Sequence, residues 1–186
     1  APADRVSLRR PQAGLARLPL QLRYWQPPRV FCLERGIIKR MPGEDRYPRP
    51  AAEAVRSFLM LRLGLRLGLR QKNLRQLLVC PHGHFPMSEK RLEDMKRGEI
   101  RWSDRDTGWE MLIPSNAFKN ANSSLFGSKP FRLVLSDLHV LYPYLDAYVD
   151  RHRGVLLGGA DDPGTFFVKI VKTTSRDAAY DQKPSM

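Results

Sequence analysis

The stretch from Gly64 to Leu78 constrains the fold of this chain most, because it ends one helical pattern and begins another. Before it, apolar residues recur at the three- and four-residue spacing of one helix face from Ala51 onward. Gly64 and Gly68 weaken that helix and supply its stop. A second helix is predicted from about Arg70 to Val79, which places this arginine beside a turn, where its guanidinium can face a ligand.

Downstream of this stretch the pattern predicts a short helix, three strands and a longer helix. The short helix is expected over 88–98, with Ser88 as its N-cap. An antiparallel sheet of three strands is predicted at Glu99–Ser103, where the residues alternate, and at Trp109–Ile113 and Pro130–Leu135, which follow a turn and a polar loop. The longer helix is expected over 136–153, either kinked at Pro143 or beginning near Leu141. The predicted fold class is therefore α+β, mainly helical with a small three-stranded antiparallel sheet.

The chain divides by composition into an arm, one domain and a tail. Residues 1–50 are rich in Pro and Arg and are interpreted as a basic arm or linker. The domain is predicted over 51–175 and includes Thr165–Val171, a buried strand or the start of another element. Residues 176–186 form a polar tail.

Charge is distributed unevenly along the chain. The 186 residues carry 32 Lys+Arg and 19 Asp+Glu, a net charge of +13. Residues 1–75 hold 17 basic and 5 acidic residues (+12), and the remainder holds 15 and 14 (+1). A field this lopsided favours a polyanionic partner, nucleic acid first and an acidic membrane surface second. A basic but solvated surface is the alternative interpretation.

The composition also argues against several classes of protein. No apolar run approaches the roughly 18 residues of a membrane span, so no membrane span is expected, and nucleic acid is preferred to a membrane as the partner. Cys32 and Cys80 are too few for a disulfide framework, which favours a reducing cytoplasmic setting. Cys80, His82 and His84 are spaced closely enough for a metal, but no second ligand pair follows them. An ordinary loop is the better interpretation, and no metal is expected.

Three features in this order resemble the N-terminal part of the catalytic domain of tyrosine recombinases, the phage-integrase family. That family opens its catalytic region with a helix ending in a Gly-Leu-Arg turn, as at Gly68–Arg70. A three-stranded sheet follows whose hairpin carries a lysine, and Lys119 in AFKNANSS occupies that place. A helix then follows the last strand, as predicted over 136–153. The resemblance covers about 51–171.

The resemblance implies chemistry on a DNA phosphodiester. In that family a tyrosine attacks the phosphate, forms a 3′-phosphotyrosyl link and frees a 5′-hydroxyl. Arg70 would clamp the phosphate, because its planar fork donates two hydrogen bonds and stays charged as negative charge develops. Lys119 would protonate the leaving 5′-oxygen, with Lys129 on the same loop as the alternative. The reaction needs no metal, nucleotide or other cofactor.

Neighbouring residues take supporting roles by the same resemblance. Arg66 and Lys72 flank the arginine and, with Lys129, would contact phosphates; a solvated face is the alternative for each. Asn73 stands where the family has an acidic residue that orients the arginine, and an amide can accept a hydrogen bond without adding charge. The implied partner is double-stranded DNA, with a homo-oligomer assembled on it, in a bacterial cytoplasm or nucleoid.

The chain departs from the family in the second half of the active site. None of its histidines has Arg three residues later, so the family's His-x-x-Arg box is absent. No tyrosine follows such a box, and Tyr180 lies too early in the order of motifs to be the nucleophile. The chain is therefore expected to be a DNA-binding part of a recombinase, inactive by itself. The alternatives are a non-catalytic nucleic-acid-binding module and a basic domain with a protein partner.

Overall fold

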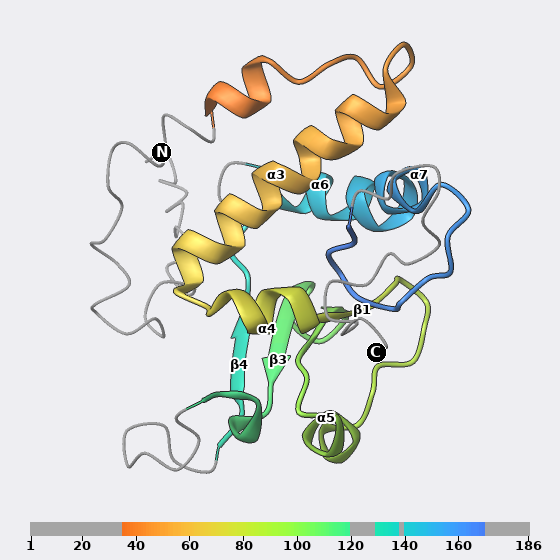
Figure 1. Ribbon diagram of the computed structural model, residues 1–186. Helices are drawn as coiled ribbons and strands as arrows, with labels where there is room; N and C mark the ends of the chain where they lie inside the picture. The colour runs from red at the N-terminus through yellow and green to blue at the C-terminus, as the bar shows by residue number, and fades with distance from the viewer. Residues whose placement is uncertain (1–34, 120–128, 138–139, 170–186) are drawn as a thin grey trace, which may run out of the picture.

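The computed structural model describes residues 35–119, 129–137 and 140–169 (Figure 1). Its labelled helices are α3 (Pro48–Leu67), α4 (Gln71–Gln76), α5 (Glu89–Met95), α6 (Leu141–Ala147) and α7 (Arg153–Leu157), and residues 35–39 are helical as well. A 3-10 turn, η1, covers Ser115–Ala117, and a π-helical turn, η2, covers Tyr148–His152. The strands are β1 (Leu78–Cys80), β2 (Glu99–Ser103), β3 (Gly108–Ile113) and β4 (Phe131–Val134).

The glycines around the first helix act differently from one another. Helix α3 begins at Pro48, where the missing N–H and fixed φ of proline suit the first turn, and it runs through Gly64 to Leu67. The helix stops at Gly68, which takes the left-handed conformation (φ 60°) of a C-cap. Gly64 instead allows close packing, because a Cβ there would lie 3.2 Å from a methyl carbon of Leu74. The predicted stop is thus confirmed at the second glycine and wrong at the first.

The predicted second helix is wrong beyond its first two turns. Helix α4 ends at Gln76, and Leu77 turns the backbone to an extended conformation (φ −61°, ψ 121°). Residues Leu78–Cys80 then form β1, and the amide of Leu78 donates to the carbonyl of Gly98 at 2.8 Å. A helix this short has few internal hydrogen bonds, so pairing with the sheet decides the conformation of its last residues.

The sheet has four strands in the order β1-β2-β3-β4. Strand β1 pairs with β2 in parallel, whereas β2 with β3 and β3 with β4 are antiparallel. The α+β class is confirmed, and the three predicted strands are present in antiparallel order. The expectation of a three-stranded, purely antiparallel sheet is wrong, because β1 adds a fourth strand in mixed pairing.

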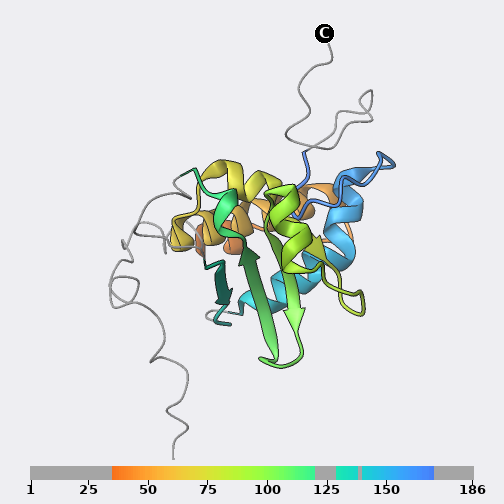
Figure 2. The same ribbon diagram turned by 90° about the horizontal axis from the view of Figure 1, so that it is seen from below.

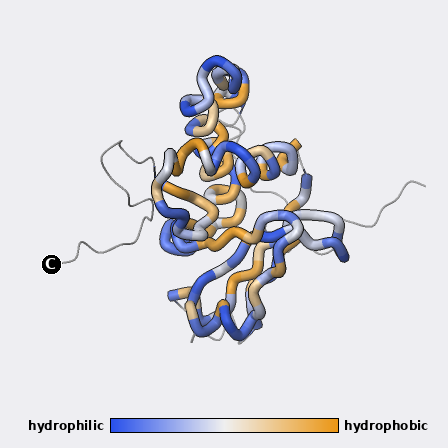
Figure 3. Tube along the Cα trace, turned by 90° about the vertical axis from the view of Figure 1, so that its right-hand side faces the viewer, coloured by the Kyte–Doolittle hydropathy of each residue, from blue (hydrophilic) through white to orange (hydrophobic). Residues whose placement is uncertain are grey.

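The two faces of the sheet carry different layers. Ile100 pairs with Met111, and both belong to the main core, which also contains Phe58 and Leu59 of α3. On the other face, Leu78 and Leu112 form a smaller cluster with Leu92 of α5. Figures 1 and 2 place α5 away from α3, near the end of the sheet where β2 begins. Figure 3 shows hydrophobic residues along the strands and hydrophilic residues at the turns between them.

Helix α5 confirms one predicted end and corrects the other. The hydroxyl of Ser88 accepts a hydrogen bond from the amide of Arg91 at 3.3 Å, as expected of an N-cap. The helix ends at Met95 and not at Gly98, because Lys96 already takes the left-handed conformation (φ 52°). Gly98 leaves room for the side chain of Ile113 instead.

The C-terminal helices complete the main core. Helix α6 begins at Leu141, one of the two predicted starts, so Pro143 falls in its first turn, where no hydrogen bond is lost. Helices α6 and α7 and the turn η2 pack along α3 (Figure 1). The strand predicted at Thr165–Val171 is reduced to a single bridge between Thr165 and Leu78; its last two residues lie outside the described part.

Residues at the predicted boundaries of the domain also contribute to the core. Ile37, Ile38 and Met41 pack against it, although they lie in the segment predicted as an arm. The division into arm, domain and tail stays a prediction, since most of the arm and the whole tail lie outside the described residues. Over the described ranges, no helix is both long enough and apolar enough to cross a membrane.

Candidate functional site

Arg70 lies in the tight connection between α3 and α4. It is the N-cap residue of α4, two residues after Gly68, and its backbone is extended (φ −64°, ψ 146°). Its side chain is exposed, and no hydrogen bond or ion pair joins its guanidinium to another described residue. Within residues 35–119, 129–137 and 140–169, therefore, no acidic side chain is paired with Arg70, which was the alternative interpretation of this arginine.

The other basic residues predicted near Arg70 lie on the same two helices. Lys72 is exposed on the first turn of α4. Arg66 belongs to the last turn of α3. Their contact with phosphates stays a prediction.

Lys119 and Lys129 both stand at one end of the β3–β4 pair. Strand β3 ends at Ile113, which pairs with Phe131 at the start of β4. The chain leaves β3 through η1 and reaches Lys119, and it re-enters β4 two residues after Lys129. Both lysines are exposed, and residues 120–128 between them lie outside the described part. The hairpin predicted to carry the lysine therefore begins and ends at neighbouring points of the sheet.

Asn73 connects the two predicted catalytic positions. Its side chain is buried, with an exposed fraction of 7%, and its Nδ2 donates to the carbonyl oxygen of Ala117 at 3.3 Å. Asn73 follows Arg70 by three residues, and Ala117 precedes Lys119 by two. Among the described residues no bond joins this amide to the guanidinium of Arg70, and the bond that is observed is a donation from Nδ2 to η1. A role for Asn73 in orienting Arg70 stays a prediction.

Two further contacts hold the segment that leads to Lys119. The Nδ2 of Asn116 donates to the carbonyl of Glu93, in α5, at 2.8 Å. The ring of Phe118 packs edge-on against that of Phe131, with 6.3 Å between the ring centroids. The turn η1 is thus attached to α4, α5 and β4 at once.

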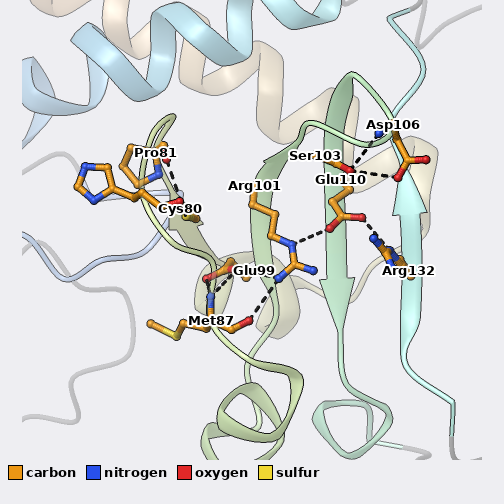
Figure 4. Close-up of polar contacts among 10 residues, drawn as sticks. Cys80, Pro81, Met87, Glu99, Arg101, Ser103, Asp106, Glu110 and Arg132 are labelled. Carbon is orange, nitrogen blue, oxygen red and sulfur yellow. Dashed lines mark hydrogen bonds and ion pairs between the residues drawn. The ribbon is translucent and has the colours of Figure 1, made fainter.

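A row of charged side chains that the sequence interpretation missed crosses β2, β3 and β4, and its two glutamates, Glu99 and Glu110, are buried (Figure 4). Nε of Arg101 donates to one oxygen of Glu110 at 2.6 Å, and Nε of Arg132 donates to the other at 2.8 Å. Arg101 also contacts Glu99 at 3.3 Å. Burial raises the pKa of Glu99, although the amide of Met87 and Arg101 both oppose this shift. The pairing Arg101↔Glu110 in the strand register puts both side chains on one face, which a correct register would have indicated.

The Cys80, His82 and His84 segment forms one wall of a pocket of about 490 Å³ above this row. Nε2 of His82 contacts Asp146 of α6 at 3.1 Å, and Sγ of Cys80 lies 3.4 Å from the carbonyl oxygen of His84. Burial raises the pKa of the Cys80 thiol, which favours its neutral, unreactive form. No group of three or more His, Cys, Asp and Glu side chains suited to a metal ion occurs within the described ranges.

Comparison with known proteins gives no relative. No protein-family model, no curated protein and no solved structure matches this chain.

Proposed function

We propose that this chain is the DNA-binding, first part of the catalytic domain of a site-specific strand-exchange enzyme of the tyrosine-recombinase type. One observation supports this most directly. The bond between Asn73 and Ala117 joins the helix that begins beside Arg70 to the turn that leads to Lys119. Two residues separated by 49 positions in the sequence thus lie next to elements that are hydrogen-bonded to each other, and both side chains are exposed.

The chemistry of the two side chains suits phosphoryl transfer. Arg70 offers a guanidinium with no partner among the described residues, so a phosphate would not have to displace an internal carboxylate. Lys119 offers an ammonium group that can give a proton to a leaving oxygen. The remaining groups of such a site, a second arginine and the nucleophile, would have to come from outside this chain.

Binding of duplex DNA tests the first part of the proposal. Fluorescence anisotropy of a labelled duplex should show affinity falling steeply between about 50 and 200 mM salt, because phosphate contacts release counterions. Arg70→Ala and Lys119→Ala should each weaken binding and reduce the salt slope by about one. Lys90→Ala, which removes an exposed lysine on α5, is the matched control and should change neither quantity. Absence of salt-dependent binding by the wild-type chain would contradict the proposal.

Covalent trapping tests the catalytic part. A nicked suicide substrate should form a protein–DNA adduct with a protein that extends this chain through the missing box and tyrosine, and not with this chain alone. Arg70→Ala and Arg70→Lys in the extended protein should abolish the adduct while leaving the circular dichroism spectrum unchanged. DNA binding without any adduct by the extended wild-type protein would favour the non-catalytic module instead.

A further inference from the structure

We infer that Asn73 positions Lys119 through the backbone of Ala117, and does not act by orienting Arg70. That Asn73 holds η1 follows from the geometry alone. That it thereby affects DNA cleavage by Lys119 rests on the proposed function. Asn73 is a positioning residue in this account, since it touches neither DNA nor the reacting atoms.

The side-chain amide of Asn73 is placed to support η1. Its Nδ2 lies 3.3 Å from the carbonyl oxygen of Ala117, and both residues are buried, with exposed fractions of 7% and 8%. A buried carbonyl needs a donor, and removal of Nδ2 leaves the carbonyl of Ala117 without the one donor observed among the described residues. Arg70 has its side chain exposed at the N-cap of the same helix, so Asn73 and Arg70 face different surroundings.

The distance along the chain from Ala117 to Lys119 is short enough to transmit this constraint. Two residues span at most about 7 Å, so fixing the carbonyl of Ala117 confines the Cα of Lys119. The bond from Asn116 to Glu93 and the packing of Phe118 restrict the same segment from other sides. The side chain of Lys119 is exposed, while the backbone that leads to it is held at Asn116, Ala117 and Phe118.

The donor role explains why an amide serves here better than an acid. An aspartate could orient a guanidinium as well as an asparagine or better, because it adds charge. Facing the carbonyl of Ala117, an ionised aspartate would place one acceptor against another and donate nothing. If Asn73 orients Arg70, Asn73→Asp should preserve that function. If Asn73 donates to the carbonyl of Ala117, the same change should remove the hydrogen bond and loosen η1.

Hydrogen exchange on this chain tests the structural half. The amides of Ala117 and Phe118 donate to Pro114 and Ser115 within η1, so their exchange rates report how well that turn is held. Asn73→Asp should speed both by about tenfold, the equivalent of one lost hydrogen bond. Gln71→Glu, the same amide-to-carboxylate change at an exposed position of α4, is the matched control and should leave both rates unchanged.

The amide of Leu135, which donates to Trp109 at 2.7 Å, provides an internal reference for the sheet and should exchange at the wild-type rate in both variants. Asn73→Ala removes the donor without adding charge and gives the same comparison if the aspartate variant does not fold. Equal protection of Ala117 and Phe118 in the wild type and in a folded Asn73 variant would overturn the inference.

A change of leaving group tests the catalytic half in the extended protein. In cleavage, the tyrosine hydroxyl gives its proton to water or to a base outside this chain, and its oxygen bonds to phosphorus. The bond from phosphorus to O5′ breaks, and the Nζ–H proton of Lys119 moves to O5′. A substrate with sulfur in place of this bridging oxygen releases a stable thiolate and does not need that proton. Asn73→Ala should slow cleavage of the oxygen substrate about tenfold, a fraction of the 10²–10⁴ that a general acid contributes, and leave the sulfur substrate nearly unaffected.

Two variants calibrate the comparison. Lys119→Ala should show the same rescue by sulfur, and Arg70→Ala should show none. An Asn73→Ala defect of equal size on both substrates would mean that Asn73 acts through Arg70, and would overturn the inference. No cleavage of either substrate by the wild-type extended protein would instead overturn the proposed function, whatever the exchange experiment shows.

Discussion

Replacement of Glu110 by Gln is expected to lower the free energy of unfolding by about 3 kcal/mol. Glu110 has an exposed fraction of 2%, and its two oxygens accept from Arg101 at 2.6 Å and Arg132 at 2.8 Å. Glutamine keeps the shape of the side chain but loses the charge. Its amide group also presents N–H donors to one of the two guanidinium groups, which has only donors itself.

The expected loss of about 3 kcal/mol depends on how buried each arginine is and on which partners it keeps. Removal of one partner from a buried ion pair costs about 3–5 kcal/mol, because the other charge stays buried without compensation. The lower end applies here, because Arg101 keeps its contact with Glu99 and Arg132 is 49% exposed and can be hydrated. For a chain of this size about 3 kcal/mol corresponds to a fall in Tm of roughly 6–12 °C.

Chemical and thermal unfolding followed by circular dichroism measure this loss. Arg132→Gln is the control, because it breaks the exposed end of the same row and should cost no more than about 1 kcal/mol. A loss under about 0.5 kcal/mol for Glu110→Gln, the range of ordinary surface substitutions, would refute the view that the row is held by a buried charge.

Three further predictions concern packing and pH. Gly98→Ala should cost about 1–3 kcal/mol in urea unfolding, because the new Cβ would lie 2.6 Å from Cγ1 of Ile113. Hydrogen bonding to Arg153 lowers the pKa of Asp162 below its ordinary value of 3.8. The ionised carboxylate therefore stabilises the fold at pH values above 3.8, and this stabilisation is lost as the pH falls through the lower pKa of the folded state. Burial lowers the pKa of His152, so acidification below its ordinary value of 6.5 should also reduce stability, as unfolding at a series of pH values would show.

Each of these has a matched comparison. Gly36→Ala, where nothing lies within 4 Å of the new Cβ, should be tolerated if steric overlap is the cause at Gly98. Asp162→Asn should remove the loss of stability below pH 3.8, and His152→Gln should flatten the stability curve below pH 6.5. A slope unchanged in either variant would assign that pH dependence to another group.

Local sequence signals predicted the parts of the fold that local chemistry decides. Gly68 ends α3 because only a residue without Cβ adopts φ 60° at low cost, and Ser88 caps α5 through its own hydroxyl. The three strands of the antiparallel part of the sheet were predicted from alternation at Glu99–Ser103 and from the turn and loop residues between the segments. The position of Arg70 beside a turn followed from the same signals.

Long-range pairing decided what the sequence could not show. The residues 77–79 continue a leucine-rich helical pattern, yet Leu78 is extended because its amide reaches Gly98. Asn73 was interpreted from its spacing to Arg70, whereas its partner Ala117 lies 44 residues away. No local pattern encodes such a contact, and the charged row on β2 and β3 likewise depends on the register between strands.

The short strand β1 has a consequence for how the molecule avoids self-association. One edge of β1 pairs with β2, and the other is covered by the chain near residues 164–166, where Val79 donates to Gly164 and Phe166 donates to Leu77. An uncovered edge would present unpaired backbone groups beside the buried Leu78, which is the template on which strands of different molecules pair. The segment that carries Phe166 therefore covers the free edge of β1 and prevents it from pairing with another molecule. A chain cut before Gly164 should form aggregates rich in intermolecular β-structure.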